Sequence, residues 1–243
     1  MTESGGKQGS TKRSRAVGTI ARTSNISRRR RAALSDGSAE YTAKREEIVR
    51  VAAELFRSQG YHATRLADVG ARAGIDRASI YYYFGSKEDL FRESVEGILD
   101  ANLARTEEVV ARDGLSTVDR IRLIVEQLML SYEQNYPHMY VYIQEQMHQV
   151  AREESAWAQE IARKTRAFDA KIVALLRLGV DTGELRGDIP LRVASSALFG
   201  MFNWTHRWFT PGGGLSAREI ADAFCNIFFE GMTALPRRSR AKN

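Results

Sequence analysis

Hydroxyl groups and cations gather within one short stretch of the chain. Tyr81–Tyr83 are consecutive tyrosines, Arg77 and Ser79 precede them, and Lys87 follows. Successive residues of a helix are about 100° apart, so a helix cannot bury three consecutive tyrosines on one side. A tyrosine hydroxyl can hydrogen-bond a phosphate oxygen, an arginine can bind a base edge, and a lysine near a helix N-terminus favours phosphate. These residue types indicate binding of a polyanion rather than catalysis.

Two short helices joined by a turn are predicted to position these side chains. One helix covers about residues 66–73 and ends at Gly74; the next follows an N-cap at Asp76, whose carboxylate accepts backbone N–H bonds, and ends at Gly85. A longer helix over residues 41–60 precedes both. This order is typical of a helix-turn-helix, whose second helix enters the major groove of DNA by its N-terminal end. Periodicity alone leaves open a small helical hairpin with a tyrosine-rich surface.

The second of these helices is expected to present its outer side to DNA. Ile80 and Phe84 are four residues apart and should face the core. The candidate DNA contacts lie on the remaining positions and on the two neighbouring elements, and they are Arg65, Arg77, Ala78, Ser79, Tyr81, Tyr82, Tyr83 and Lys87.

The formal net charge of +6 is concentrated at the two ends of the chain. Residues 1–40 hold nine Lys or Arg and three Asp or Glu, residues 93–235 hold fourteen and twenty, and residues 236–243 hold four and none. A basic front beside an acidic body favours contact with a polyanion at one end only. Chain ends are also charged simply because they are solvated, and this alternative stays open for both tails.

The fold class is predicted to be all-α, with about nine helices, because no strand alternation of any length follows the helix-turn-helix. Residues 1–40 are Ser-, Gly- and Arg-rich and are expected to be disordered. The later helices are expected over residues 86–111, 116–135, 138–151, 153–179, 190–209 and 216–235.

Several other classes of protein find little support in the composition. The one cysteine, Cys225, excludes an intramolecular disulfide, and no apolar run approaches the roughly 20 residues of a membrane span. The four histidines lie in unrelated segments, without an HExxH motif, a nucleophile elbow or a phosphate loop. We therefore expect a cytoplasmic protein that is not an enzyme and needs no cofactor, metal or membrane. A helical enzyme or metal-binding protein is the alternative, for which Glu145 and His148 on one helix face are a minimal signal.

Residues 64–91, TRLADVGARAGIDRASIYYYFGSKEDLF, resemble the DNA-binding signature of the TetR family of bacterial repressors. The matching parts are A-G-I at residues 73–75, Y-Y-Y-F at residues 81–84 and S-K-E-D-L at residues 86–90. The family usually has Ser or Thr capping the second helix, where this chain has Arg65. Either Thr64 caps that helix or the cap is lost, at a cost of about 1 kcal/mol.

The resemblance covers about residues 42–235 and implies a TetR-like repressor. It implies a DNA-binding domain over residues 41–102 and a ligand-binding and dimerisation domain over residues 103–235; the composition adds a basic tail over residues 236–243. Such a protein binds an inverted-repeat operator in double-stranded DNA as a homodimer and is released by a small-molecule effector. The C-terminal region resembles actinobacterial TetR repressors of lipid and steroid breakdown, some of which sense acyl-CoA thioesters. A regulator of efflux that senses a drug-like aromatic ligand is the alternative, and a purely architectural DNA binder would not need so large an aromatic-rich body.

The residues themselves allow both a pocket and a dimer interface in the C-terminal region. Aromatic side chains with polar tips suit pockets, because pockets combine apolar walls with a few polar groups. The expected effector contacts are Tyr132, Tyr136, Tyr140, Met147, Trp157, Phe168, Trp204, Arg207 and Trp208. Small residues on one of the last two helices and apolar residues on the other predict a four-helix dimer interface with Ala197, Gly200, Ile220, Phe224, Ile227 and Phe228.

Overall fold

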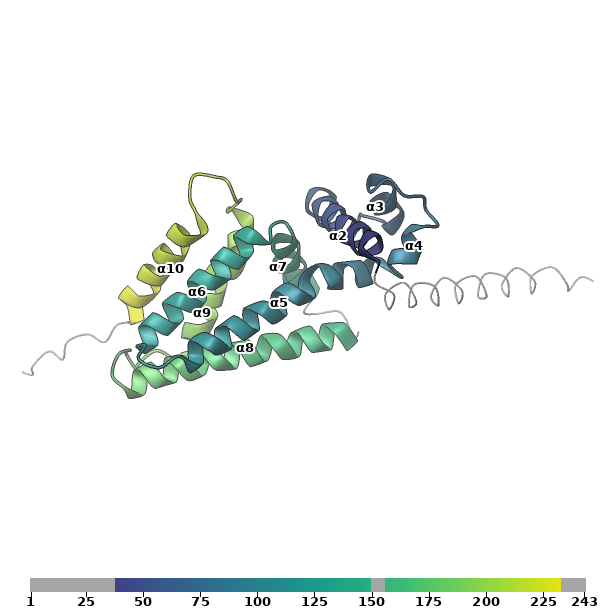
Figure 1. The fold of residues 1–243 in the computed structure, drawn as a ribbon. Coiled ribbons are helices and arrows are strands. Elements are labelled where there is room, and N and C mark those ends of the chain that lie inside the picture. Colours follow the sequence, from purple (N-terminus) through teal and green to yellow (C-terminus); the bar gives the residue numbers. More distant parts are fainter. Residues whose placement is uncertain (1–37, 150–155, 233–243) are drawn as a thin grey trace, which may run out of the picture. The chain divides into compact units, whose positions relative to one another are not determined.

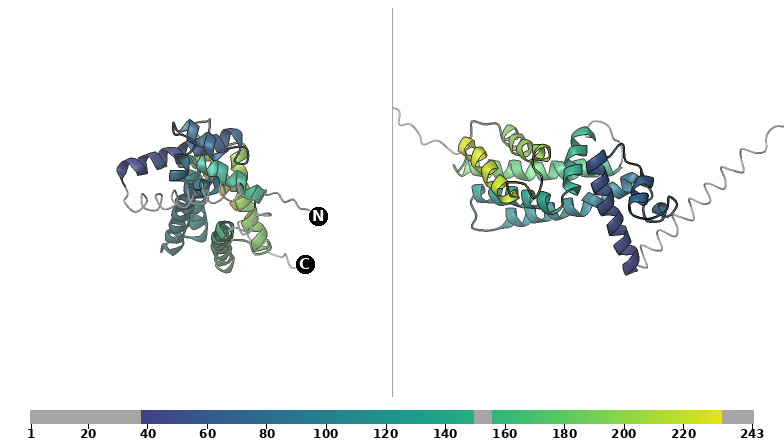
Figure 2. Two further views of the ribbon diagram at one scale, coloured as in Figure 1. Left: turned by 90° about the vertical axis from the view of Figure 1, so that its right-hand side faces the viewer. Right: turned by 90° about the horizontal axis from the view of Figure 1, so that it is seen from above.

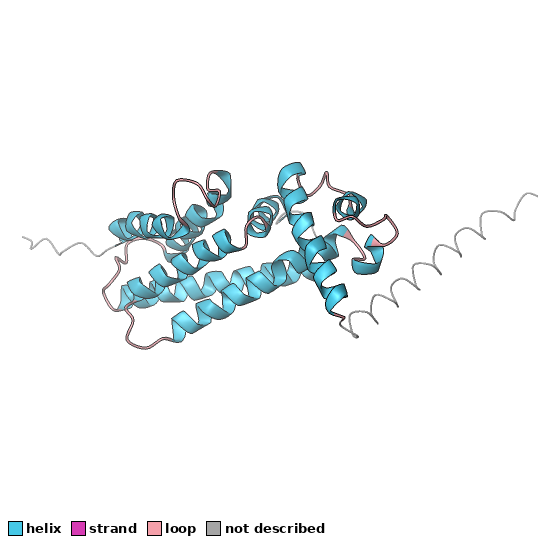
Figure 3. Ribbon diagram, turned by 45° about the horizontal axis from the view of Figure 1, so that its top comes forward, coloured by secondary structure: helices cyan, strands magenta, loops and turns pink. Residues whose placement is uncertain are grey.

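The structure, a computed structural model, describes residues 38–149 and 156–232, without the side chains of residues 146–149, 156 and 232. Within these ranges the chain forms helices joined by loops and turns, and no strand (Figure 3). The all-α prediction is therefore confirmed. The predictions for the basic tail before residue 38, the tail at residues 236–243 and the side chains of Met147 and His148 lie outside the described residues.

Nine α-helices and one short 3-10 helix follow one another in the described residues (Figure 1). They are α2 (Ala39–Gln59), α3 (Leu66–Arg72), α4 (Ile80–Tyr83), α5 (Lys87–Ala111), α6 (Thr117–Gln134), α7 (His138–Gln149), α8 (Ala156–Asp181), α9 (Leu191–Trp204), η1 (Thr205–Arg207) and α10 (Ala217–Met232). Most bounds lie close to the predicted ones. Two differ: α4 begins only at Ile80, and the helix expected over residues 190–209 ends at Trp204 and continues as η1.

The chain divides into two compact units, one ending at Glu93 and the other beginning at Ser94. The first unit holds α2, α3, α4 and the start of α5, and the second holds the rest of α5 and α6 to α10. The division falls inside α5, earlier in the chain than the domain boundary that the sequence suggested after residue 102.

A close approach between α3 and α4 builds the core of the first unit. A Cβ at Gly70 would lie 3.2 Å from the Cβ of Ile80, so a larger residue there would push α4 away. Ile80 and Phe84 are buried, as their spacing predicted, and both belong to the same core as Ile48 and Phe56 of α2. Burial of Ile80 and Phe84 fixes which side of α4 faces outward.

The helix α3 begins without a side-chain cap. Arg65 occupies the N-cap position, and its side chain makes no capping hydrogen bond. The Thr64 hydroxyl does not replace it, because that hydroxyl donates to the carbonyl of Gly60 at 2.9 Å. The carboxylate of Asp68 accepts the backbone N–H of Arg65 at 3.0 Å, so half of a capping box is present. Of the two sequence alternatives, the lost cap is the one that the structure has.

In the second unit α6 packs against α8 on one side and α10 on the other, and α8 packs against α9 (Figure 2). The core side chains come from all these helices and include Ile121, Ile124, Met129, Tyr132, Ile172 and Leu176.

The connection from α8 to α9 fastens this bundle at one end. Gly183 has φ +80°, a left-handed conformation that ends α8. The carboxylate of Glu184 then accepts the backbone N–H of Thr117 at 2.9 Å, at the start of α6. Leu185 packs against Gly179, where a Cβ would lie 2.7 Å from the Leu185 side chain. The short segment Gly183–Leu185 thus joins three helices.

Within residues 38–149 and 156–232, no helix is both long and apolar enough to cross a lipid bilayer. The same ranges hold no group of three His, Cys, Asp or Glu side chains placed to bind a metal ion. Cys225 is buried, and burial raises the pKa of its thiol to about 11. An uncharged, inaccessible thiol is a poor nucleophile.

The missing cap of α3 gives a stability prediction. Arg65→Thr should raise the free energy of unfolding by about 0.5–2 kcal/mol, because a threonine hydroxyl at that position can accept a backbone N–H of the first turn, at Ala67 or Asp68. Urea unfolding monitored by circular dichroism measures the change. Arg72→Thr, at an exposed position in the last turn of the same helix, is the matched control and should bring no gain. Equal stability of wild type and Arg65→Thr would contradict the assignment.

Candidate nucleic-acid interface and effector cavity

A tight turn ahead of α4 is ordered by one carboxylate. Asp76 Oδ1 accepts the backbone N–H groups of Ala78 at 2.7 Å and Ser79 at 3.0 Å, and Asp76 Oδ2 accepts the Ser79 hydroxyl at 2.5 Å. These bonds hold the pKa of Asp76 below its ordinary value, with the Ser79 hydroxyl as the largest contribution. The capping role predicted for Asp76 is confirmed, although the helix itself starts later. The Ser79 hydroxyl is engaged within this turn by its hydrogen bond to Asp76, while Arg77 and Ala78 are exposed on the turn.

The three consecutive tyrosines take three different environments. Tyr81 is the most exposed, at 39% of its surface. Tyr83 stacks on Tyr41 of α2, with ring centroids 5.1 Å apart and an interplanar angle of 17°. Tyr82 meets the same Tyr41 ring edge-on at 5.4 Å. As expected, at least one tyrosine faces away from the core, and the other two lie sideways, against the start of α2.

Arg45 of α2 holds the other end of α4. Its Nη1 donates to the carbonyl of Tyr83, and its Nε donates to Glu93 Oε1 at 2.6 Å. The guanidinium carbon also lies 4.2 Å from the centroid of the Phe84 ring. Lys44, the preceding residue, donates from Nζ to the carbonyl of Ala73 at 2.8 Å, at the end of α3. Sequence reasoning missed both anchors, because charged residues on an amphipathic helix ordinarily read as a solvated face.

Lys87 has an internal partner as well. Its Nζ donates to the carbonyl of Tyr61 at 2.7 Å and lies 4.3 Å from the centroid of the Tyr61 ring. A second carbonyl, that of His62, is 3.3 Å away. Lys87 therefore fastens the loop before α3 to the start of α5, and its predicted contact with phosphate stays a prediction.

The exposed surface around α4 combines donors suited to nucleic acid. Arg65 at the start of α3 and Arg77 before α4 are exposed, and in the described part of the chain no hydrogen bond or ion pair engages the Arg77 guanidinium. Such an arginine can bind a guanine edge or a phosphate through two parallel bonds. The Tyr81 hydroxyl adds a donor on the same short element. The arrangement has the donors that reading a groove requires.

A second site lies inside the C-terminal unit, where several helices leave a cavity of about 130 Å³. Its wall is mainly apolar, and the lining residues are Leu99, Asn102, Leu103, Leu128, Met139, Tyr142, Ile161, Lys164, Thr165, Phe168, Phe199, Phe202 and Asn203. They come from α5, α6, α7, α8 and α9. An apolar wall with a few polar groups is the usual composition of a small-molecule site.

The polar groups of the cavity include one cation. Lys164 of α8 enters the lining together with Asn102, Tyr142, Thr165 and Asn203. Burial raises the pKa of Tyr142 to about 12, and a hydrogen bond with Thr165 lowers it in part, so the phenol stays protonated at neutral pH. The described residues of the lining include no carboxylate.

Most of the expected effector contacts lie elsewhere than in this cavity. Phe168 is the expected residue that lines it. Tyr132 is fully buried in the core. The rings of Tyr132, Tyr136, Tyr140 and His206 form a row in which the centroids of successive rings are about 6 Å apart. Trp157 is half-buried on α8. A role of these aromatic residues in effector binding stays a prediction.

The two tryptophans that were expected in the pocket wall lie at the surface. Trp204 is 52% exposed and Trp208 is 49% exposed. Arg207 is also exposed and lies 4.9 Å from the Trp204 ring. The reason is the end of α9 at Trp204: Thr205 and His206 turn inward in η1, and the residues on either side turn outward.

Trp204 is one of several exposed apolar or small residues on α9 and α10, which together are called the apolar stripe. Spacing of four, three and four residues places Val193, Ala197, Gly200 and Trp204 on one face of α9, and all are exposed. Ile227 of α10 is 66% exposed. An exposed apolar surface of this kind is typical of a protein interface.

Two of the residues expected at a dimer interface are instead inside the unit. Ile220 and Phe228 are buried, because they lie on the side of α10 that packs against α6. Phe224 is half-buried, and Ala197, Gly200 and Ile227 are exposed. The place of these residues in a dimer interface stays a prediction, and the exposed surface that a partner could cover is the apolar stripe, defined by Val193, Ala197, Gly200, Trp204 and Ile227.

Known proteins resemble this chain over most of its length. The HTH-type transcriptional repressor KstR2 of Rhodococcus jostii is 28% identical over 200 residues, which cover 82% of this chain and 96% of that protein. KstR2 of Mycobacterium tuberculosis is 25% identical over 80% of this chain and 95% of its own length.

Solved structures share the fold. The ketosteroid transcriptional regulator KstR2 of Mycobacterium tuberculosis superposes with a TM-score of 0.71 at 24% identity and covers 78% of this chain and 94% of that one. The regulator AibR, solved in complex with isovaleryl coenzyme A and operator DNA, has a TM-score of 0.63 at 21% identity and covers 76% and 97%.

Two family descriptions match consecutive parts of the chain. Residues 48–94 match the bacterial regulatory proteins of the tetR family, and these residues contain the turn at Asp76 with Arg77 and the helix α4. Residues 114–232 match the tetracyclin repressor-like C-terminal domain. The resemblance that the sequence suggested is confirmed over both units: this chain belongs to the TetR family of bacterial transcriptional regulators.

Proposed function

We propose that the protein is a transcriptional repressor that binds an inverted-repeat operator as a homodimer and releases it when a small apolar effector enters the C-terminal unit. The observation that carries this proposal is the helix α4 with the turn before it: Asp76 orders the turn, Arg45 holds the end of the helix, and Arg77 of the turn and Tyr81 of the helix are exposed. One such element covers only a few base pairs, so specificity in a genome needs two half-sites and a two-fold dimer. The apolar stripe on α9 and α10 is the surface that we assign to that dimer.

The proposed effector is an apolar compound, and the proposed class includes acyl-CoA thioesters. The cavity of about 130 Å³ would hold an acyl group or a ring fragment and not a whole coenzyme. The relatives support this class: KstR2 of Mycobacterium tuberculosis is described as a ketosteroid regulator, and AibR was solved with isovaleryl coenzyme A. By extension, the proposed target genes serve lipid or steroid breakdown.

A second candidate is a regulator of efflux that senses a drug-like aromatic compound. The row of rings from Tyr132 to His206, which meet in tilted or edge-on contacts, favours it, because aromatic side chains offer large apolar surfaces with polar tips to an aromatic ligand. The effect of acyl-CoA thioesters and of aromatic cations on operator binding separates the two candidates.

Arg77→Ala should weaken operator binding by about 1–3 kcal/mol and relax sequence preference, because an exposed arginine at the helix start reaches base edges. Operator sequences selected from random DNA and fluorescence anisotropy measure both effects. Arg105→Ala removes the same charge from an exposed position in the second unit and should leave binding unchanged. Undiminished affinity and selectivity of Arg77→Ala would remove Arg77 from the interface.

Lys87→Ala should behave differently from Arg77→Ala. Loss of the bonds to the carbonyls of Tyr61 and His62 should lower the melting temperature, and DNA binding should fall for all sequences alike. Arg77→Ala should keep the wild-type melting temperature. Calorimetry of both variants tests this contrast; a Lys87→Ala protein as stable as wild type would show that the anchoring contact contributes nothing.

Ile227→Glu should yield folded monomers, because the new charge would be buried in the dimer without a partner. Sedimentation velocity gives the mass, and circular dichroism checks the fold. Leu178→Glu is the matched control: Leu178 is an exposed leucine on α8, at 42% exposure, outside the apolar stripe, so this variant should stay dimeric. An intact dimer of Ile227→Glu would place the interface elsewhere.

A further inference from the structure

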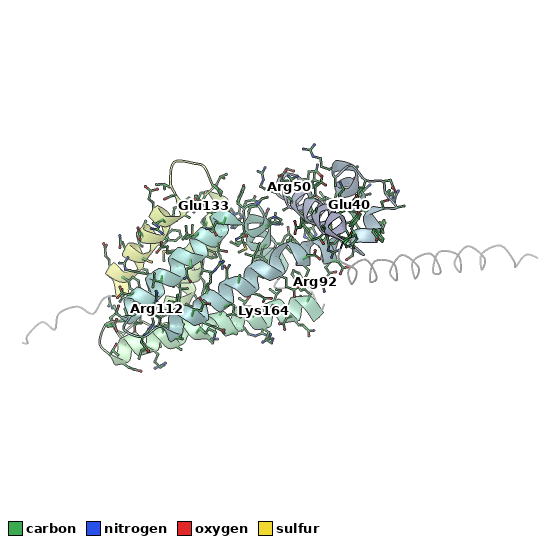
Figure 4. All side chains as sticks on the ribbon, in the orientation of Figure 1. Glu40, Arg50, Arg92, Arg112, Glu133 and Lys164 are labelled. Carbon is green, nitrogen blue, oxygen red and sulfur yellow. The ribbon has the colours of Figure 1, made fainter. Side chains whose placement is uncertain are left out.

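One side chain belongs both to the wall of the cavity and to a link between two helices. Lys164 of α8 lines the cavity, and its ammonium also forms an ion pair with the carboxylate of Asp100 on α5. Figure 4 labels Lys164 on α8, which runs beside α5 in this unit. The stem of Lys164 is well packed, with 18% of the side chain exposed, whereas Asp100 is 53% exposed.

The environment of Asp100 differs from the environment that a carboxylate bound in the cavity would have. Asp100 stands half in water, and an ion pair with so exposed a partner contributes little to stability, since solvent compensates both charges when it breaks. A carboxylate inside the cavity would be surrounded mainly by apolar side chains, where its attraction to the ammonium is less screened. Asn102, Thr165 and Asn203 in the same lining can donate to its second oxygen.

A second ion pair repeats the first one without touching the cavity. Lys171 of α8 pairs with Glu107 of α5 at 3.0 Å, and both residues stand seven positions after Lys164 and Asp100. Their side chains are 33% and 54% exposed. The two pairs link the same helices, and the Lys164 pair is the one with a lysine in the cavity wall. The Lys171 pair is therefore a built-in control.

We propose that Lys164 is the anion-recognition residue of the cavity, that the cavity takes an apolar compound carrying a carboxylate, and that this carboxylate takes Lys164 away from Asp100. Binding would then remove one of the two ion pairs between α5 and α8. The proposal rests on the proposed function for its regulatory meaning, since α5 begins at Lys87, within the unit that carries α4. The ligand class and the exchange of partners stand on the cavity and the two ion pairs alone.

The test compares octanoate with 1-octanol, which share an apolar chain of the same length and differ in charge. Isothermal titration calorimetry on the full-length protein should give at least about tenfold tighter binding of octanoate. Lys164→Met keeps a linear apolar stem and should abolish this preference, while Lys171→Met should retain it. Equal binding of the two compounds by wild type, or no binding of octanoate, would overturn the carboxylate site.

Exchange of partners makes a distinct prediction for the acidic residues. Asp100→Asn should bind octanoate several-fold more tightly than wild type, because no carboxylate competes for Lys164 any longer. Glu107→Gln, the control, should bind as wild type does. A merely structural role of Asp100 predicts the opposite, a loss of affinity as the unit loosens, and that result would reject the exchange. Melting temperatures of all four variants identify any that fail to fold.

These binding measurements are made without DNA, so they test the carboxylate site independently of the proposed repressor function. Loss of operator binding in every condition would reject the repressor and leave the carboxylate site in place. Normal operator binding with equal affinity for octanoate and 1-octanol would do the reverse.

Discussion

The position of the short helix α4 depends on one guanidinium. A four-residue helix is far below the roughly 12–15 residues that an isolated helix needs, so α4 exists only through its contacts with the rest of the unit. Arg45 binds the carbonyl of Tyr83 at the end of α4, lies over the Phe84 ring and pairs with Glu93 of α5. It therefore joins α2, α4 and α5. With Ile80 buried against Gly70, this contact determines which way the tyrosines point.

Five basic residues of the first unit fall into two groups with different structural roles. Lys44, Arg45 and Lys87 donate to backbone carbonyls at the ends of helices and loops, where unpaired acceptors and the negative end of the helix dipole favour a cation. Arg65 and Arg77 are exposed at the starts of α3 and α4. A net positive charge counted from the sequence thus overstates the charge available to a polyanion, because part of it is committed to holding the unit together.

Helix order, fold class and the core face of α4 could be predicted, because 3.6-residue periodicity and strong turn residues determine them locally. The Asp76 cap followed from residue type and spacing in the same way. The anchoring role of Arg45 could not be predicted, since its partners are far away in the sequence. Periodicity did not identify the outer face of α10 for another reason. Apolar residues lie on both faces of this helix, so the exposed Ile227 and the buried Phe228 cannot be told apart in the sequence. The cavity forms where side chains from five helices leave a space unfilled, and the pattern of a single helix carries no information about that space. Phe168 is the residue that was both predicted as an effector contact and found in the cavity wall.

The distribution of aromatic residues gives the two units separate optical signals. All three tryptophans, Trp157, Trp204 and Trp208, follow Ser94, whereas Tyr41, Tyr61 and Tyr81–Tyr83 precede Glu93. Light absorbed only by indole therefore excites the C-terminal unit alone, and the first unit contributes phenol emission only. Trp204 and Trp208 stand half in water on or beside the apolar stripe, so their emission is sensitive to whatever covers that surface. Unfolding of the first unit by itself would pass unseen in tryptophan fluorescence and would appear in the near-ultraviolet circular dichroism of its stacked tyrosines.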